Sequence, residues 1–308
     1  MTYGATDSRY LIGKETSYAD GGTPSKDIGL VTSVSDNNTR EIIRISKGIG
    51  QRGLAAVFGG TIDSGDTVTF QFQHGRILEY VFGKVEHEQE AASDDWKHVF
   101  SLTTDNPTFA SESSESGTAD SGTLKKGNAI DSFSLNIELN GVLTGEFTTL
   151  AAEPENVTSV TSKVISSLPT FHHQNVKVKL DDVDIPEVQN FSINFEGVVQ
   201  RAYGIGGPSA KQGGTLEANF TFNGTVGLSN NDYNTLFQGD TKCTIELVGD
   251  NDVAIGSGKR AINLKLKDCV LSQKNKVVSV GELIFVDIEG EGVLEKCETV
   301  DNIASGDW

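Results

Sequence analysis

Residues 67–73 read TVTFQFQ and residues 216–223 read LEANFTFN, so apolar and polar side chains alternate in both stretches. A period of two places Val68, Phe70 and Phe72 on one face of an extended strand and the polar side chains on the other. The same alternation recurs at 131–139, 191–196 and 261–267. Alternation of this kind is typical of antiparallel sheets with one polar face, so the sequence predicts an all-β fold.

Two short segments depart from this pattern and predict helices. They cover residues 75–82 and about 230–237, and they end at Gly83 and Gly239. Glycine directly after a helix is the usual C-terminal cap. We therefore expect two short helices in an otherwise β-rich chain.

The chain contains an internal repeat with an offset of about 156 residues. Val31–Ser35 matches Val188–Ser192, and Gly48-Ile49-Gly50 matches Gly204-Ile205-Gly206. Each glycine motif is followed by a Gly-Gly-Thr triplet, a strand and a short predicted helix. Further along, residues 98–103 align with 243–248, and 130–139 align with 260–267. This order indicates a tandem duplication of one β-domain.

The repeat predicts the organisation of the chain. Residues 1–27, rich in Gly and Ser, are expected to form an N-terminal arm that orders on a neighbour, residues 28–165 a first domain, and residues 166–308 a second. The first copy carries a longer Ser, Glu, Asp and Gly tract at 105–128. We predict a mobile surface loop there, because so polar a tract cannot form a core.

The composition excludes several classes of protein. Asp and Glu number 43 against 25 Lys and Arg, giving a formal charge of −18, which disfavours tight binding of phosphate backbones. No apolar run approaches the roughly 20 residues of a membrane-spanning helix, so no membrane insertion is expected. No secretory signal is visible at the start of the chain. The 3 cysteines are far apart and are expected to be reduced, packed thiols.

Motifs that could carry chemistry are better explained as turns. Residues 48–53 spell GxGxxG, but no helix follows to receive a pyrophosphate. Asp63-Ser64-Gly65 and Asp120-Ser121-Gly122 resemble aspartic protease tripeptides, yet both lie in one repeat copy. His172 and His173 are adjacent in an extended segment and so point in opposite directions. We predict no catalytic residue, no cofactor and no metal site, and hence no enzyme.

A family resemblance rests on motifs spread along the chain. They are Tyr3-Gly4, Lys14–Tyr18, Gly59-Gly60-Thr61, Tyr80–Gly83 and Ile185–Ile193. With these motifs the chain resembles the major tail tube proteins of long-tailed, siphovirus-like viruses of bacteria and archaea. The resemblance implies β-sandwich domains, each with a small helix, whose inner sheets join between neighbours into a continuous β-barrel around a channel. Most members form six-membered rings, so a duplicated member is expected to form a homotrimeric, pseudo-hexameric ring.

The resemblance also implies two sets of functional residues. Polar residues of the two best strands are candidates to line the lumen, where uncharged or acidic side chains would let DNA slide past. They are Thr67, Thr69, Gln71, Gln73, Glu217, Asn219, Thr221 and Asn223. The Gly-rich segments 47–60 and 202–214 are candidate contact loops between domains or rings. Their candidate residues are Gly48, Gly50, Arg52, Gly53, Gly204, Gly206 and Lys211.

The expected partners follow from the same resemblance. They are further copies of the chain in stacked rings, the tape-measure protein, the tail-terminator and tip proteins, and viral DNA in transit without specific binding. The expected location is the virion tail, assembled in the host cytoplasm. Two alternative hypotheses remain beside the tail tube: an ordinary monomeric β-sandwich, and a secreted or surface module for carbohydrate binding or adhesion. The module would need exposed aromatic side chains, and the chain has 2 Trp.

Overall fold

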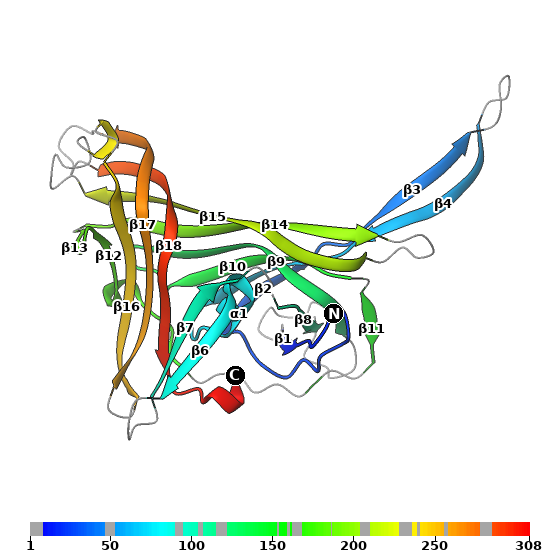
Figure 1. The fold of residues 1–308 in the computed structure, drawn as a ribbon, viewed down its shortest axis with the longest axis horizontal. Helices are drawn as coiled ribbons and strands as arrows, with labels where there is room; N and C mark the ends of the chain where they lie inside the picture. Colours follow the sequence, from blue (N-terminus) through cyan, green and yellow to red (C-terminus); the bar gives the residue numbers. More distant parts are fainter. Residues whose placement is uncertain are drawn as a thin grey trace.

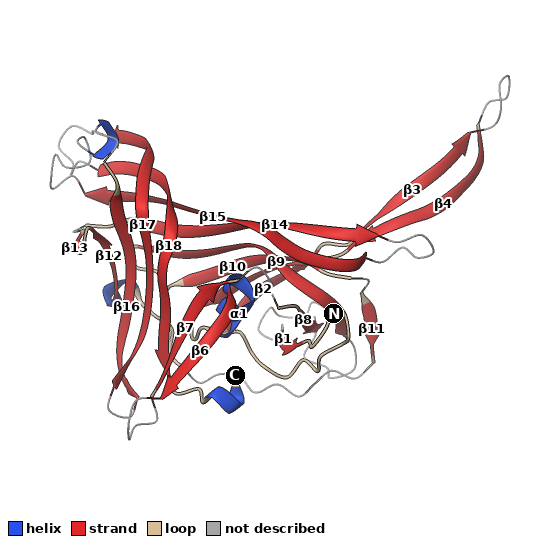
Figure 2. Cartoon of the chain, in the orientation of Figure 1, coloured by secondary structure: helices blue, strands red, loops and turns tan. Residues whose placement is uncertain are grey.

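The chain is built almost entirely from antiparallel strands, as Figures 1 and 2 show. In the computed structural model the described residues are 9–46, 53–89, 95–103, 107–114, 122–152, 154–158, 161, 168–185, 187–203, 210–227, 236–238, 241–255, 258–277 and 285–308. The predicted all-β fold is confirmed.

The first half of the chain contains a path of six neighbouring strands, which we call the N-terminal path. Its order across the sheet is β1-β8-β9-β10-β5-β2, and every neighbouring pair is antiparallel. The strands are β1 (Arg9–Lys14), β2 (Leu30–Asp36), β5 (Asp66–Gln71), β8 (Phe109–Ser114), β9 (Gly122–Glu138) and β10 (Thr144–Leu150).

The second half contains a path with the same order, which we call the C-terminal path. It runs β12-β16-β17-β18-β15-β14, again antiparallel throughout. The strands are β12 (Val176–Leu180), β14 (Asn190–Tyr203), β15 (Ala210–Gly227), β16 (Cys243–Ile255), β17 (Gly258–Val277) and β18 (Phe285–Asp301). If the six strands of each path are numbered in chain order, both paths run first, fourth, fifth, sixth, third, second across the sheet.

The two paths meet inside the chain, where β14, at the edge of one path, pairs with the part of β9 that β8 leaves uncovered in the other. Strand β14 pairs with β9 from Asn190 opposite Glu138 to Glu196 opposite Ser132, without a register shift. The sheet therefore continues from β17 and β18 through β15, β14, β9 and β10 to β5 and β2. We call the β14–β9 contact the internal seam.

Shorter elements are added to this sheet. Strands β3 (Thr39–Ser46) and β4 (Leu54–Asp63) form a separate two-stranded hairpin that reaches away from the body at the upper right of Figure 1. Strands β6 (Gly83–Gln89) and β7 (Trp96–Leu102) form a second hairpin, which pairs with β18. The remaining elements are α1 (Arg76–Phe82), β11 (Glu155–Val157), β13 (Val183–Asp184) and the one-turn segments His173–Asn175 and Ser305–Asp307.

Helix α1 lies in the core between the two paths. Every residue from Ile77 to Phe82 is buried, and Gly83 ends the helix in a left-handed conformation with φ of 100°. The ring of Phe82 lies 6.2 Å from Phe195 of β14 and 6.1 Å from Phe220 of β15. The first predicted helix and its glycine cap are thus confirmed. Of the second, residues 236–238 are helical, and the rest, with Gly239, lies outside the described residues.

Two predictions about the first half were wrong. The tract 105–128 was expected to be a mobile loop, but it contains β8, paired on both sides, and the start of β9. Within the expected arm 1–27, residues 9–14 form β1, and Tyr10, Leu11 and Ile12 are buried against the same chain. Both segments are polar, yet Glu15 accepts hydrogen bonds from the Gly127 amide at 3.0 Å and the Thr108 hydroxyl at 2.8 Å. Long-range partners of this kind satisfy the buried polar groups.

Candidate functional site

The continuous sheet has one apolar face toward the core and one polar face. In β5, Val68 and Phe70 are fully buried, whereas Thr67, Thr69 and Gln71 are half-buried on the opposite face. Because successive side chains of a strand point to opposite faces, the predicted polar side of this strand is the side away from the core. These three candidates therefore lie on one surface.

Strand β15 repeats this arrangement in the second half. Phe220 and Phe222 are buried, and Asn219, Thr221 and Asn223 alternate with them on the other face. Glu217 belongs to β15, but its side chain is outside the described part of the chain. Both predicted strands thus supply polar side chains to the same sheet, four strand spacings apart.

Gln73 does not belong to this surface, which corrects the prediction. Strand β5 ends at Gln71, and the side chain of Gln73 is buried, with its amide nitrogen donating to the Leu168 carbonyl oxygen. The alternation in the sequence continues for two residues beyond the strand. Its last polar residue is used to hold a neighbouring segment rather than to face outward.

The strands between and beside β5 and β15 extend the polar face. The structure adds residues that we did not single out as candidates from the sequence: Ser132, Ser134, Asn136 and Glu138 of β9, Thr144, Glu146 and Thr148 of β10, Asn190, Ser192, Asn194 and Glu196 of β14, and Asp287, Glu289 and Glu291 of β18. The same period-two pattern could have found most of them. In β18 the glycines at 290 and 292 weaken that pattern, because they contribute no apolar side chain.

The charge on this polar face has one sign. Across β2, β5, 132–138 of β9, β10, 190–196 of β14, 219–225 of β15 and 287–291 of β18, the sequence contains no Lys or Arg. Carboxylates are present, and hydroxyl groups hydrogen-bond to them: Thr69 donates to Glu146 at 3.2 Å, and Thr225 donates to Asp287 at 2.8 Å. A surface of hydroxyl, amide and carboxylate groups repels a polyanion and offers it no cation to bind.

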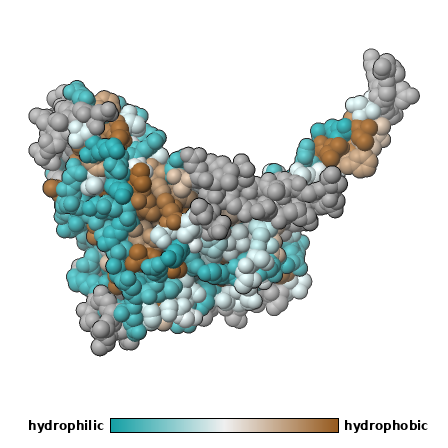
Figure 3. Space-filling view, viewed as in Figure 1, coloured by the Kyte–Doolittle hydropathy of each residue, from teal (hydrophilic) through white to brown (hydrophobic). Residues whose placement is uncertain are grey.

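The hairpin β3–β4 is the second unusual surface. Its large apolar side chains are about half exposed, with Ile43 at 47% and Phe58 at 54%. Ile43 is opposite Phe58 in the register, and further exposed apolar residues are Ile42, Ile45, Leu54 and Val57. Figure 3 shows this apolar cover on the projecting hairpin. Contiguous exposed apolar surface of this kind marks an interaction site.

Most of the predicted contact-loop residues lie outside the part of the chain that the structure describes. Gly48, Gly50, Arg52, Gly204 and Gly206 are outside the described residues. Gly53 directly precedes β4 and has a φ of 105°, and Lys211 is in β15 with its side chain undescribed. The loops therefore connect β3 to β4 and β14 to β15, at equivalent places in the two halves.

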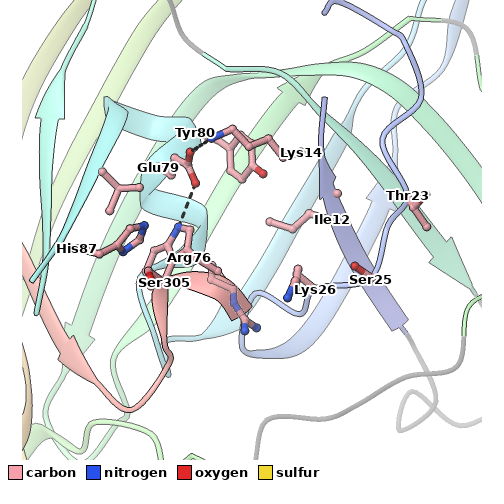
Figure 4. Close-up of a pocket in the computed structure, with 13 residues that line it drawn as sticks. Ile12, Lys14, Thr23, Ser25, Lys26, Arg76, Glu79, Tyr80, His87 and Ser305 are labelled. Atoms are coloured by element: carbon pink, nitrogen blue, oxygen red, sulfur yellow. Dashed lines mark hydrogen bonds and ion pairs between the residues drawn. The ribbon is translucent and has the colours of Figure 1, made fainter. Parts of the chain in front are cut away.

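A cavity of about 460 Å³ lies where β1, α1 and the C-terminal segment meet (Figure 4). Its cations already have partners within the chain. Lys14 pairs with Glu79 at 2.5 Å, and Arg76 pairs with Asp27 at 2.5 Å. Glu79 also accepts a hydrogen bond from the ring nitrogen of Trp308 at 3.0 Å. Paired charges in such a place indicate a joint between segments rather than a binding site for a charged ligand.

Other sites suggested by motifs gain no support. Among the described residues no group of three His, Cys, Asp or Glu side chains could hold a metal ion. Cys243, Cys269 and Cys297 are free and buried, as predicted. None of the helices in the described ranges is long and apolar enough to cross a membrane.

Comparison with known proteins agrees with this picture of a structural molecule. A family model described as phage tail tube protein matches residues 5–292. No curated protein matches the chain. The match covers nearly the whole sequence, including the internal seam and both strand paths except the part of β18 after residue 292. The chain belongs to the phage tail tube protein family, and it is therefore a structural, non-enzymatic component of the virion that is assembled in the host cell.

Proposed function

We propose that this protein forms stacked homotrimeric rings of a siphovirus-like tail tube, and that the tube is the conduit through which viral DNA is delivered. Each chain supplies two duplicated units, one for each strand path, so three chains make a pseudo-hexameric ring. The observation that carries this proposal is the internal seam. Strand β14, at the edge of one path, pairs with the part of β9 that β8 leaves uncovered in the other, so each chain already contains one joint between two units.

The shared order of the two paths supports the duplication. In each path the first strand in the chain lies at one edge and the second at the other, with the last two strands in the middle. Sheets that join edge to edge leave no open edges, and a closed barrel removes them altogether. Closing a ring with further copies would therefore remove the open edges that remain on the two units of each chain.

The polar face supports the role as a conduit. In a closed ring the apolar face of the sheet packs against the core, so its polar face lines the bore. Six of the lumen candidates, Thr67, Thr69, Gln71, Asn219, Thr221 and Asn223, share that face with the carboxylates of β10, β14 and β18. DNA would pass such a lining without being held, because it meets acceptors and negative charge rather than cations.

The hairpin β3–β4 supports stacking. It lies between β2 and β5 in the sequence, and it carries exposed apolar side chains away from the body. Burying them against the next ring would stabilise the stack by about 25 cal/mol for each Å² of apolar surface covered. The tape-measure, terminator and tip proteins are the further partners proposed for the assembled tube.

Imaging of the purified chain tests this function. Negative-stain images should show rings or tubes of uniform bore, and light scattering should give multiples of three chains. A chain that remains monomeric at high concentration would instead support the adhesion or carbohydrate-binding module.

A paired variant tests the hairpin separately. Ile43→Ser combined with Phe58→Ser should still give rings but no long tubes, because both side chains are exposed within a single chain. Val183→Ser is the matched control, since Val183 is 68% exposed on another strand, and it should leave tubes unchanged. Tubes of normal length from the hairpin variant would contradict the stacking role.

A further inference from the structure

We infer that the ring closes through one particular strand pairing: β2 of one chain pairs antiparallel with the end of β17 of the next chain, with Val31 opposite Leu271. This inference rests on the ring assembly of the proposed function. It adds the two strands, their direction and their register, all taken from contacts within one chain.

A single row of paired residues crosses the sheet from β17 to β2. Starting from β17, the row is Leu271, Gly290, Phe222, Ile193, Leu135, Gly145, Phe70 and Val31, each paired with the next. The residue types repeat after four strands: leucine, glycine, phenylalanine and a β-branched aliphatic residue. The internal seam lies in the middle of this row, where Ile193 is opposite Leu135.

The ends of the row are the residues that would meet in the next seam. Val31 occupies in β2 the place that Ile193 occupies in β14, and Leu271 occupies in β17 the place of Leu135 in β9. Repeating the internal seam once more therefore puts Val31 opposite Leu271 of the neighbouring chain. Since strands alternate in direction along the row, β2 and β17 approach each other antiparallel.

The two strands at the ends of this row, β2 and β17, each have an open edge at that point. Among the described residues β2 pairs only with β5, and Val270–Gln273 of β17 pairs only with β18. The side chains of Val31 and Leu271 are already buried on the core side, at 9% and 7% exposure. In contrast, Val270 is 42% exposed. Each open edge thus has an apolar side chain on the core face, and a strand of a neighbouring chain could extend that face.

The open edges differ from the internal seam in one respect. The seam holds seven consecutive pairs, Asn190 to Glu196, without a shift. In contrast, β2 has a bulge between Val31 and Ser33, and β17 has one between Leu271 and Gln273. Bulges at edges discourage pairing with arbitrary strands. They limit the pairing between chains to a short register centred on the row.

Cysteine cross-linking tests the register. Ser33 is in the place of Asn194 and Val270 is in the place of Ser134, a pair in the internal seam. The double variant Ser33→Cys with Val270→Cys should form disulfides between chains, because antiparallel neighbours lie within disulfide range. The two sites in one chain are seven strand spacings of about 4.8 Å apart along the sheet, so a bond within the chain is excluded.

Three matched variants give the comparison. Ser35→Cys with Val270→Cys shifts the register by two residues, and should cross-link at least about tenfold more slowly. Asn194→Cys with Ser134→Cys should form its bond within one chain and give no larger species. Each single variant should give none, because the native cysteines are buried.

The expected result is a covalent species of three chains from Ser33→Cys with Val270→Cys in mildly oxidised assemblies. If wild-type protein forms tubes but the shifted pair cross-links as fast or faster, the tube function stands and this register is wrong. If the wild-type chain forms no ring, the proposed function fails and the seam with it. Should the double variant not assemble, hydrogen exchange on wild-type tubes decides. Backbone amides of 30–36 and 270–273 should gain protection on assembly, and unchanged exchange at both would overturn the inference.

Discussion

The two strand paths share their order, but they differ in what is attached to them. In the N-terminal path, β2 and β5 stop and a separate hairpin, β3–β4, continues outward. In the C-terminal path, β14 and β15 run on without interruption for 14 and 18 residues. The common path sets the sheet, whereas the additions distinguish the two halves. One half carries the exposed apolar hairpin, and the other extends its two strands as a paired ribbon with register shifts at Gly197/Val199 and Ala202/Tyr203.

The paths also hold their buried cations differently. Lys125 of β9 has a buried carboxylate partner, Asp66, at 2.7 Å, and it donates to the Gly65 carbonyl oxygen at 2.6 Å. Burial raises the pKa of Asp66 above its usual value, and Lys125 opposes that shift. Arg260 of β17 instead donates to the Pro169 carbonyl oxygen at 2.5 Å and lies 5.3 Å from the ring centre of Phe171. Burial lowers the pKa of Arg260 to about 10.

The largest effect should come from breaking the buried ion pair. Lys125→Met leaves the buried carboxyl group of Asp66 without its cationic partner, so the free energy of unfolding should fall by about 3–5 kcal/mol. Denaturant unfolding of the monomer measures it. Adding Asp66→Asn to the same chain should recover most of the loss. Equal stability of the single and double variants would show that the charge of Asp66 is not the cause.

Arg260→Met provides the matched comparison in the other path. Among the described residues, Nη2 of Arg260 has no hydrogen-bond partner, and no carboxylate is hydrogen-bonded to the guanidinium group. Removing this cation therefore does not leave a hydrogen-bonded carboxylate without its partner. The loss should be about 1–2 kcal/mol, from the carbonyl hydrogen bond and the contact with the ring. A loss as large as that of Lys125→Met would remove this difference between the paths.

An intermediate effect should come from the two glycines of the shared row. A methyl group on Gly145 would overlap the ring of Phe70, and one on Gly290 would overlap the ring of Phe222 and the Val270 carbonyl oxygen. Gly145→Ala and Gly290→Ala should each cost about 1–3 kcal/mol, with Gly290→Ala the larger because backbone cannot move aside easily. Thermal unfolding would measure both. Gly306→Ala is the control, since open space surrounds that position.

The smallest effect should be a pH dependence where the two paths touch. His87 of β6 lies 2.7 Å from His98 of β7, measured between their Nδ1 atoms, and His98 contacts Asp301 of β18 at 3.0 Å. Burial, and then the neighbouring His98, lower the pKa of His87. The unfolded chain therefore takes up this proton at a higher pH than the folded chain does. Stability should fall as the pH drops through the ordinary histidine range, near 6.5.

The variant His87→Gln isolates that contribution. Its denaturation midpoint should change less between about pH 7.5 and 5.5 than that of the wild-type chain. The carboxylates of Glu79 and Asp301 and the ammonium of Lys14 also act on His87, so the comparison is the difference between variant and wild type. An identical pH profile for both chains would contradict the assignment.

Much of the sheet could be predicted from local alternation. The predictions at 67–73, 131–139 and 261–267 fall on β5, β9 and β17. The cap at Gly83 was also predicted, because a left-handed residue after a helix favours glycine. These features depend on residues close in sequence, and so they can be read locally.

The remainder depends on partners distant in the sequence. Strand β8 reads FASESS, which suggests a loop, but its Glu112 accepts a hydrogen bond from the Thr161 amide at 2.7 Å. The repeat alignment matched residues 98–103 to 243–248, whereas in the paths it is β8 that occupies the place of β16. The hairpin β6–β7 inserted after α1 displaced the alignment. The sequence could not show that this hairpin pairs with β18 of the other half.

That pairing has a mechanical consequence. Strand β7 joins β18 along Trp96–Phe100, Trp308 lies 4.0 Å from the ring of His98, and Phe82 of α1 packs on both β14 and β15. These contacts hold the two paths together on the core side of the internal seam. A change in the angle between the paths would break them. In the proposed ring, stiff joints inside the chains would alternate with unbraced joints between them, and bending or widening of the bore would be concentrated at the latter.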